Sequence, residues 1–212
     1  MKKLIIFGAP GAGKGTFASQ IKEVIPQIIH ISTGDIFREN LKNETTLGMK
    51  AKEFMEKGDL VPDDIVIEMV HDRLNKEDVK QNGFILDGFP RTLPQAEALS
   101  KITDIDLVIL LNVPEDIIIK RILGRYSCPN CGKIYNKFFM KPKKEGMCDD
   151  CGEKIEFKQR SDDTEETLKN RLDVFKNNTE PLVKYYKNKG IIKEIDYTKK
   201  LPQKKVKKII KN

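Results

Sequence analysis

A glycine-rich segment close to the start of the chain constrains its fold more than any other feature. It follows a short apolar run, Lys3–Phe7, and leads directly into a helix-like segment that begins near Lys14. This order of strand, glycine-rich turn and helix is typical of a phosphate-binding loop, because backbone N–H groups of the turn and the helix N-terminus can meet phosphate oxygens. We expect Lys14 to reach the outer phosphates and Thr16 to lie near a metal ion. The segment reads Gly8-Ala9-Pro10-Gly11-Ala12-Gly13-Lys14-Gly15-Thr16.

Short apolar runs alternate with helix-like segments along most of the chain. The runs are rich in Ile, Leu and Val and show little polar alternation, as expected for parallel strands that are covered on both faces. Their alternation with helices predicts an α/β fold with a doubly wound, five-stranded parallel sheet. The expected strands are Lys3–Phe7, Gln27–Ile31, Phe84–Asp87, Leu107–Asn112 and Ile191–Ile195.

Two stretches interrupt this pattern, and both are longer than ordinary connections between elements. Residues 32–61 read as helices without a strand, and residues 124–163 contain all four cysteines of the chain. We therefore expect a core domain made of residues 1–31, 62–123 and 164–212. The two interruptions would form two inserted subdomains, the first helical and the second a small metal-binding unit.

The C-terminal part of the chain is expected to hold three helices. A first helix would start after the capping residues Asp162–Glu166 and run toward Asn178. Pro181 would separate it from a second helix, which would end at Gly190. The final lysine-rich segment carries much of the net charge of +7, and its apolar residues fall on one helical face. A helix packed on the core with a solvated lysine face explains this pattern better than a nucleic-acid-binding tail.

The four cysteines have the spacing of a metal site. They form two C-x2-C pairs separated by sixteen residues. Four thiolates fill the tetrahedral coordination of a zinc ion and leave no open position, so the site would be structural. Iron in the same geometry and a pair of redox-active C-x2-C motifs are the alternatives. The expected ligands are Cys128, Cys131, Cys148 and Cys151.

A second phosphate-handling segment begins at the end of the expected strand Phe84–Asp87. Asp87 would face the same sheet edge as the glycine-rich loop, because both follow parallel strands. A carboxylate at this place can hold Mg²⁺, directly or through water. Asp-Gly is also common turn chemistry, so an ordinary exposed turn is the alternative. The segment continues as Gly88-Phe89-Pro90-Arg91-Thr92.

Six arginines stand near these motifs or in the insertions, in a chain that is richer in lysine. A planar guanidinium group can contact a phosphate at two points, which lysine cannot do. Any one of these arginines could be an ordinary surface ion-pair residue. Together they carry more positive charge than one triphosphate requires, so we expect two phosphorylated ligands and a transfer between them. They are Arg38, Arg91, Arg121, Arg125, Arg160 and Arg171.

Histidine is scarce in this chain, which contains only His30 and His71. His30 lies in an apolar run, so we expect both residues to be structural. A phosphate oxygen of a nucleoside monophosphate is already deprotonated near pH 7 and can attack without a general base. Positioning and charge neutralisation by arginines, one lysine and Mg²⁺ would then suffice for catalysis.

With these residues in view, the chain resembles the adenylate kinases, in particular their long-lid, zinc-containing bacterial type. The resemblance covers almost the whole chain. The phosphate loop has the family's G-x-P-G-x-G-K-G-T form, which accounts for Gly15. Further segments match the family in order and spacing: Ile31–Asp35, Asp59–Pro62, Asp87–Arg91, Leu123–Arg125 and Gln159–Asp163.

The resemblance implies the reaction Mg·ATP + AMP ⇌ 2 ADP and assigns residues to each nucleotide. Lys199 would contact ATP through its backbone. Two insertions would close over the substrates and exclude water, with the second insertion acting as the lid. ATP would be bound by Gly11, Ala12, Gly13, Lys14, Gly15, Thr16, Arg121, Arg125, Ile134, Tyr135 and Lys199.

The resemblance also implies an AMP site and a catalytic set. Arg38 and Arg91 would grip the AMP phosphate, and Thr33 and Gln95 would read its base. The AMP site would comprise Thr33, Arg38, Asp59, Leu60, Val61, Gly88, Phe89, Pro90, Arg91, Gln95, Arg160 and Arg171. The catalytic residues would be Lys14, Asp87, Arg91, Arg125, Arg160 and Arg171, and the lid would hold one structural Zn²⁺.

Other functions remain open for the same residues. A kinase for UMP, CMP or another monophosphate could use the same scaffold, since base choice depends on few contacts. A zinc-knuckle nucleic-acid-binding NTPase would use the C-x2-C pairs and the lysine tail, although the knuckle has few interleaved aromatic and basic residues. A nucleotide-binding regulator without activity would have lost Lys14, Asp87 or an arginine, and all are present.

The expected partners are ATP, AMP and ADP, with neither nucleic acid nor membrane. No apolar run approaches the roughly 18–20 residues of a membrane helix. The first expected strand begins at the N-terminus without a signal segment before it, so we expect a cytoplasmic protein. Nothing in the motifs requires more than a monomer.

Overall fold

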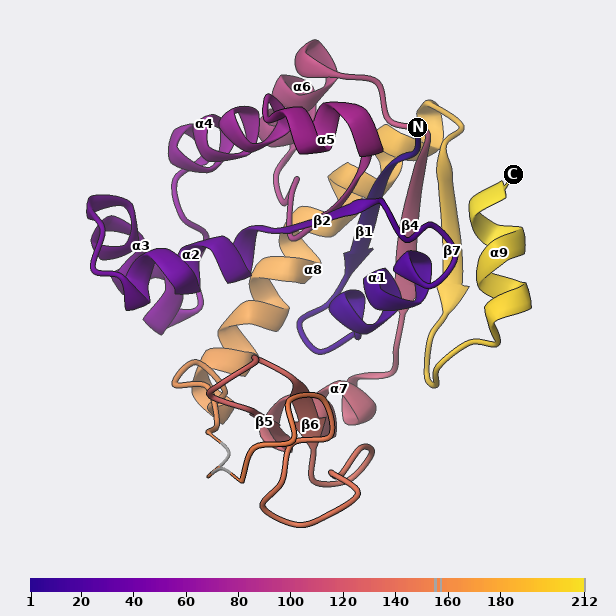
Figure 1. Cartoon of the computed structure of the whole chain (residues 1–212). Helices are drawn as coiled ribbons and strands as arrows, with labels where there is room; N and C mark the ends of the chain where they lie inside the picture. Colours follow the sequence, from indigo (N-terminus) through magenta and orange to yellow (C-terminus); the bar gives the residue numbers. More distant parts are fainter. Residues whose placement is uncertain (155, 157, 212) are drawn as a thin grey trace.

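Five parallel strands form the central sheet in the computed structural model of the chain, which describes residues 1–154, 156 and 158–211. The strand order is β2-β3-β1-β4-β7, which confirms the doubly wound α/β fold (Figure 1). Each strand lies within one or two residues of its expected position. The strands are β1 (Lys3–Gly8), β2 (Ile29–Ser32), β3 (Phe84–Asp87), β4 (Leu107–Asn112) and β7 (Ile192–Asp196).

Apolar residues of β1 alternate between two cores, one on each face of the sheet. Leu4 and Ile6 belong to a core that includes residues of α1 (Lys14–Lys22) and α9 (Gln203–Lys211). Ile5 and Phe7 belong to the opposite core. Because both faces are covered by helices, the strands are apolar throughout rather than alternating. The opposite core is built with α4 (Asp63–Leu74), α5 (Glu77–Asn82), α6 (Leu93–Ile102) and α8 (Glu165–Asn188).

The loop after β1 lies at the point where the strand order reverses. From β1 the chain crosses first to β2 and β3 on one side, and later to β4 and β7 on the other. Ligands of open α/β sheets bind at such a switch point, beyond the carboxyl ends of the strands. Ile6 of β1 pairs with Asp87 of β3, so the carboxylate that ends β3 stands beside the glycine-rich loop.

Two helices, α2 (Thr33–Lys42) and α3 (Thr46–Lys57), form the segment between β2 and α4. Hydroxyl caps start both, since Ser32 Oγ accepts from the Asp35 amide and Thr45 Oγ1 accepts from the Gly48 amide. Gly48 lets the two helices approach closely: a Cβ there would lie 2.4 Å from the carbonyl of Asn40. This segment contains helices and no strand, as predicted.

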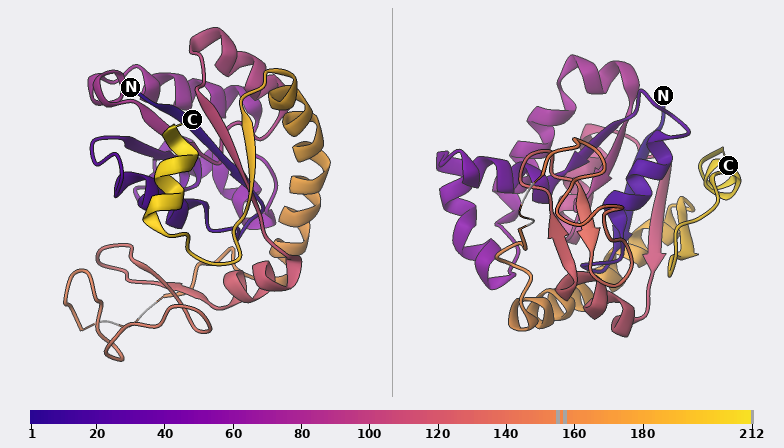
Figure 2. Two further views of the ribbon diagram at one scale, coloured as in Figure 1. Left: turned by 90° about the vertical axis from the view of Figure 1, so that its right-hand side faces the viewer. Right: turned by 60° about the horizontal axis from the view of Figure 1, so that its bottom comes forward.

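The cysteine-containing segment extends away from the sheet, between α7 (Glu115–Leu123) and the start of α8 (Figures 1 and 2). Its own sheet is small and antiparallel, with β5 (Arg125–Ser127) paired to β6 (Ile134–Asn136). The buried residues of its small core are Cys128, Tyr135 and Cys148. Such a core is too small to stabilise the segment alone, so a bound metal would have to contribute.

The expected helix break at Pro181 is wrong, because α8 runs unbroken from Glu165 to Asn188 with the proline inside it. The proline removes one backbone hydrogen bond, but packing on both sides of it compensates. Leu172 before it and Leu182 after it are both buried against the core. The capping prediction holds at the other sites: Thr164 accepts from the Thr167 amide, and Gly190 has a φ of +69°.

The lysine-rich end of the chain is the packed helix α9, as predicted. Val206 and Ile210 are buried in the core that contains α1, and the lysines of the helix are exposed. In the part of the chain that the structure describes, no helix is both long and apolar enough to cross a membrane.

Candidate active site

The glycine-rich loop curls over the end of β1 as the sequence predicts. Gly11 and Gly13 have φ values of +78° and +91°, which residues with a Cβ rarely adopt. A Cβ at Gly11 would also lie 2.9 Å from the Ile122 side chain. Lys14 Nζ donates to the carbonyls of Gly8 and Ala9, at 2.9 and 3.1 Å. The lysine therefore spans the loop and is ready to exchange these carbonyls for phosphate oxygens.

Several positively charged side chains surround Lys14. Burial is the main reason that its pKa is lowered to about 8. The carboxylate of Asp87 opposes this shift, and the guanidinium groups of three arginines add to it. Cations are unfavourable neighbours unless an anion lies between them. The loop and its surroundings are thus arranged for a polyanion. The three arginines are Arg91, Arg171 and Arg125.

Arg91 lies close to the glycine-rich loop, and its side chain is held by a hydrogen bond to a residue of its own segment. Its Nε donates to the Gly88 carbonyl at 2.8 Å. Burial lowers the pKa of Arg91 to about 10, and the nearby charge of Arg171 acts in the same direction. Gly88 has a φ of +83°, and a Cβ there would lie 2.7 Å from Thr33 Oγ1. This close packing brings Thr33 and Arg91 together at one end of the sheet.

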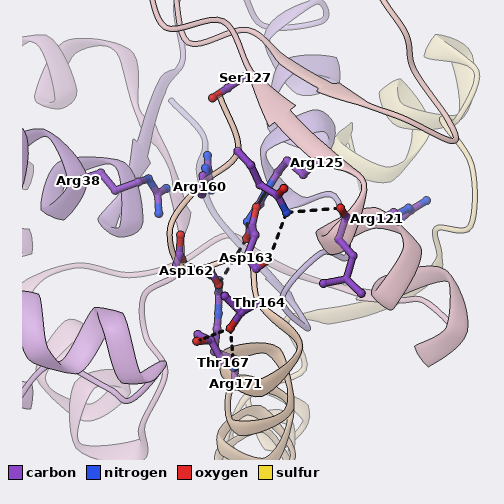
Figure 3. A network of polar contacts seen from close by, with 12 residues as sticks. Arg38, Arg121, Arg125, Ser127, Arg160, Asp162, Asp163, Thr164, Thr167 and Arg171 are labelled. Atoms are coloured by element: carbon purple, nitrogen blue, oxygen red, sulfur yellow. Dashed lines mark hydrogen bonds and ion pairs between the residues drawn. The ribbon is translucent and has the colours of Figure 1, made fainter. Parts of the chain in front are cut away.

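Carboxylates at the base of α8 hold two more of the expected arginines (Figure 3). Asp163 accepts from Nε of Arg125 at 2.7 Å and forms a second short contact with the same guanidinium. Asp162 accepts from Arg171 at 2.9 Å. Burial lowers the pKa of Arg171, while Asp162 opposes the shift. The two arginines are therefore positioned, and partly neutralised, without a nucleotide.

Asp35 at the start of α2 likewise positions two further arginines through its carboxylate. It accepts from Arg38 in a short contact and lies 3.9 Å from Arg160. The pKa of Asp35 is lowered by the positive charges of both, against the opposing effect of burial. Burial also lowers the pKa of Arg160 to about 10. An arginine from the cysteine-containing segment and one from the helical insertion thus share a carboxylate.

Arg121 joins the glycine-rich loop to the end of β7. Its NH1 donates to the Ala12 carbonyl at 3.0 Å, and its NH2 donates to the carbonyls of Tyr197 and Thr198 at 3.1 and 2.7 Å. Lys199, which is exposed, follows directly. Arg121 and the backbone near Lys199 therefore lie on the same side of the loop.

Two adjoining pockets open at this edge of the sheet. The first is lined by the loop residues Gly8, Pro10 and Lys14 together with α8. The second is lined by α2, α6 and the segment after α3. Residues lining both pockets include Gly58, Leu60, Gly88, Arg91 and Arg171. A ligand in each pocket would therefore meet the other at these two arginines.

Most of the expected AMP-site residues line the second pocket. Gln95 is almost fully buried at its wall, and Thr33 Oγ1 donates to the Gly88 carbonyl at 3.0 Å. Phe89 is buried in the core beside the sheet and Pro90 lines the first pocket. The second pocket's lining includes Thr33, Arg38, Asp59, Leu60, Val61, Gly88, Arg91, Gln95 and Arg171.

Two expected ATP contacts differ in what they can offer a ligand. The Tyr135 side chain is 1% exposed, and its hydroxyl accepts from the Asp149 amide at 2.7 Å and lies 3.5 Å from Cys148 Sγ. Its ring therefore supports the cysteine cluster, which leaves only its backbone for a nucleotide. Ile134 beside it is partly exposed.

The residues around Asp87 fit a magnesium ion that a nucleotide would bring. Asp87 is nearly buried at the end of β3, and a Cβ at Gly15 would lie 3.9 Å from its Oδ2. Thr16, next in the chain, is exposed and can offer its hydroxyl. Oxygen donors of this kind suit Mg²⁺. His30 Nε2 lies 3.4 Å from Asp87 Oδ2, so this histidine is closer to the site than its apolar run suggested.

The four cysteines converge on one point, as their spacing predicts. Their Sγ atoms all lie within 4.8 Å of one another. The Cys128–Cys151 and Cys131–Cys148 Sγ distances are 3.8 and 3.5 Å. A tetrahedral ion with Zn–S bonds of about 2.3 Å would separate its sulfurs by about 3.8 Å. The donor set and spacing therefore fit a structural zinc ion.

The structure adds site residues that the sequence does not identify. The carboxylates of Asp35, Asp162 and Asp163 hold the arginines. The sequence predicts the arginines as site residues but not these acidic partners. Acidic residues at or just before helix starts, close to the expected arginines, are the one signal that could have indicated them. Asp63 and Tyr197 also contact site residues across long separations in sequence.

The fold and the site define a P-loop phosphotransferase with room for two phosphorylated ligands. Comparison with known proteins is more specific. The family model described as Adenylate kinase matches residues 6–191. The chain belongs to the adenylate kinase family.

Three bacterial relatives named adenylate kinase illustrate the similarity. The chain is 56% identical to the protein of Caldicellulosiruptor bescii over 195 residues, which covers 90% of this chain and 89% of the relative. It is 52% identical to that of Clostridium tetani over 201 residues, covering 92% and 91%. It is 53% identical to that of Carboxydothermus hydrogenoformans over 207 residues, covering 95% and 94%.

Proposed function

We propose that this chain catalyses the reversible transfer of a phosphoryl group from Mg·ATP to AMP, which yields two ADP. One observation carries the proposal: the two pockets share Arg91 and Arg171, and Lys14 lines the first of them. Cations at the boundary between two ligand sites are suited to a group that moves from one ligand to the other. The family name supports the same reaction.

The transfer needs no acid or base from the protein. An oxygen of the AMP phosphate attacks the γ-phosphorus of ATP, and the bond from that phosphorus to the β–γ bridging oxygen breaks. One ADP forms from AMP and the other remains from ATP, so atoms and charge balance. Lys14, Arg91 and Arg171 would stabilise the charge on the transferred group, and the loop amides would hold the β-phosphate.

Mg²⁺ bound with ATP would neutralise charge on the β- and γ-phosphates. Asp87 would hold it, directly or through water, with Thr16 offering a hydroxyl. Arg125 and Arg160 would exchange their aspartate partners for phosphate oxygens when the nucleotides bind. Arg38 would hold the AMP phosphate from the opposite side. Arg38 lines the second pocket, and the other roles rest on the contacts of Asp87, Arg125 and Arg160 and on the family resemblance.

The two insertions would close over the nucleotides. We place the core at residues 1–31, 62–123 and 164–212, the AMP-binding insertion at 32–61 and the lid at 124–163. Asp35 and Arg160 come from the two insertions and lie 3.9 Å apart, so the two insertions can meet above the site. Closure would exclude water and protect ATP from hydrolysis. A zinc ion held by the four cysteines would keep the lid folded.

A monomer in the cytoplasm fits this proposal. The proposed reaction requires no residue from a second chain. The four cysteines must stay reduced to hold a metal, which a reducing compartment allows.

The proposal is tested by measuring ADP formation from Mg·ATP with AMP, beside parallel reactions with UMP, CMP, GMP or no acceptor. Turnover that depends on both AMP and Mg²⁺ is expected. Faster turnover with another monophosphate would keep the mechanism and reassign the base. Absence of transfer to every acceptor would contradict the proposal.

A further inference from the structure

The side-chain amide of Gln95 is held by two hydrogen bonds, one from a donor and one to an acceptor. The Arg91 backbone amide donates to Gln95 Oε1 at 2.7 Å. Gln95 Nε2 donates to Asp63 Oδ1, also at 2.7 Å. Gln95 is only 2% exposed, and it lines the second pocket. The amide is therefore fixed at the wall of the pocket where the monophosphate's base would lie.

Asp63 is itself fixed by a second hydrogen bond. Its Oδ2 accepts from Thr92 Oγ1 at 2.8 Å, and Thr92 Oγ1 in turn accepts from the Gln95 backbone amide at 3.3 Å. These bonds tie the first residue of α4 to the cap of α6, two helices that lie side by side (Figure 1). Both oxygens of Asp63 are thus committed, and the contact to Gln95 is not an adjustable surface interaction.

The two partners of Gln95 leave its amide only one orientation. A backbone N–H can only donate, and a carboxylate can only accept. Rotation of the amide by 180° would set donor against donor at Arg91 and acceptor against acceptor at Asp63. The unmet polar groups would be buried, which is costly. One hydrogen on Nε2 and one lone pair on Oε1 remain available.

We propose that Asp63 is a positioning residue that fixes the polarity of the Gln95 amide and thereby sets the choice of purine. Adenine offers an acceptor at N1 and a donor at N6, which the free hydrogen of Nε2 and the free lone pair of Oε1 match. Hypoxanthine and guanine offer the reverse, a donor at N1 and an acceptor at O6. A rotated amide would suit them, and Asp63 opposes that rotation together with the Arg91 backbone amide.

This inference rests on the proposed function, because it takes the base in the second pocket to face Gln95. Unpaired buried polar groups are what allow a site to reject a closely similar ligand. Inosine monophosphate is the sharpest probe, since it differs from AMP at this edge of the base alone. The quantity to measure is the ratio of kcat/KM for AMP to kcat/KM for inosine monophosphate.

Two variants alter, in different ways, the hydrogen bonds that fix the Gln95 amide. Asp63→Ala removes the acceptor, so that only the Arg91 backbone amide still opposes rotation of the Gln95 amide. The exchange Asp63→Asn with Gln95→Glu keeps a hydrogen bond at every position, since the new amide donates to the new carboxylate. That carboxylate would present only acceptors to the base. Asp64→Asn, at an exposed acid in the same turn of α4, is the matched control.

We expect the AMP-to-inosine-monophosphate ratio to fall at least tenfold in both altered proteins, with KM for ATP unchanged. The control should keep the wild-type ratio. The double exchange tests the fixed orientation of the side chain at position 95 even if Asp63→Ala does not fold. An unchanged ratio in a folded variant, with activity toward both acceptors reduced equally, would overturn the inference and leave the proposed function standing. A wild-type protein without AMP-dependent turnover would overturn both.

Discussion

Arg125 and Asp163 lie 38 positions apart in the sequence and form a two-point ion pair that joins the two ends of the cysteine-containing segment, residues 124–163. The Asp163 side chain has no exposed surface, and Arg125 Nε lies 2.7 Å from its Oδ2. The buried carboxylate aims the guanidinium before any nucleotide arrives. An arginine that is already ordered loses less conformational entropy on meeting a phosphate, so the pair prepares the site for binding.

Replacing Arg125 by lysine keeps the charge but loses the planar two-point contact. We expect kcat to fall roughly tenfold to hundredfold, because a lysine cannot reproduce the geometry at a developing charge. We also expect a lower Tm, since Asp163 would keep a poorer partner. Steady-state kinetics and a thermal melt measure both effects.

Arg73 provides the control for that substitution. It forms a comparable two-point pair with Asp78, at 2.9 and 2.7 Å, on an exposed surface away from the pockets. Arg73→Lys should change kcat by less than about twofold, as exposed pairs contribute little. Equal losses of activity in the two variants would contradict the role assigned to Arg125.

Nucleotide binding should take up protons near pH 8.5. Burial lowers the pKa of Lys14 to about 8, so the lysine is largely neutral above that pH. A bound phosphate favours the charged lysine and raises its pKa, so the complex binds protons that the free protein lacks. Calorimetric titration with ATP in two buffers of different ionisation enthalpy measures this uptake. Lys14→Met should abolish it, whereas proton release in the wild type would contradict the assignment.

The same shift predicts the pH dependence of stability. The folded pKa of about 8 lies below the ordinary lysine value of 10.5, so between these values the unfolded chain binds more protons than the folded one. The contribution of Lys14 to the free energy of unfolding therefore rises with pH across this window. Lys14→Met should flatten the rise when chemical unfolding is measured at pH 8 and pH 10. An identical slope in both proteins would refute it.

The Tyr135 hydroxyl should strengthen metal binding. It lies 3.5 Å from Cys148 Sγ and accepts from the Asp149 amide, so it orients one of the four ligands. Tyr135→Phe is expected to weaken zinc binding roughly tenfold to hundredfold, as loss of such supporting contacts generally does. Competition with a chromophoric chelator gives the affinity. Tyr185 lies in α8, remote from the cysteines. Tyr185→Phe should therefore leave that affinity unchanged.

Removing the metal should loosen the lid more than the core. The lid's own core consists of few residues, so the ion would supply much of its folding energy. Hydrogen exchange should accelerate over residues 127–151 and stay slow in β1 and β4. Verified loss of zinc without faster exchange in the lid would show that the metal is dispensable for its fold.

The sequence predicts most of the fold because the chemistry of the core is local. The apolar strands, the glycine-rich loop and the cysteine spacing each indicate a structure within a few neighbouring residues. Pro181 misleads for the opposite reason. Its local preference is to end a helix, but burial of Leu172 and Leu182 along the core outweighs the lost hydrogen bond.

The carboxylates of the site could not be found in the same way. The arginines stand out by type, yet nothing in sequence links Arg125 to Asp163 or Gln95 to Asp63, which are brought together by the path of the chain. Arg125 begins β5 and Asp163 lies just before α8, whereas Asp63 begins α4 and Gln95 lies in the first turn of α6. Such pairing depends on tertiary structure, and it decides how the predicted residues are aimed.

The most direct test of the central claim follows the γ-phosphoryl group itself. The protein is mixed with Mg·ATP labelled at the γ-phosphorus and with saturating AMP, and the products are separated during the first turnovers. Our account predicts that the label appears at the β-position of ADP, with none in inorganic phosphate, because the closed site passes the group directly to AMP. Label released as inorganic phosphate, or retained in ATP, would contradict it.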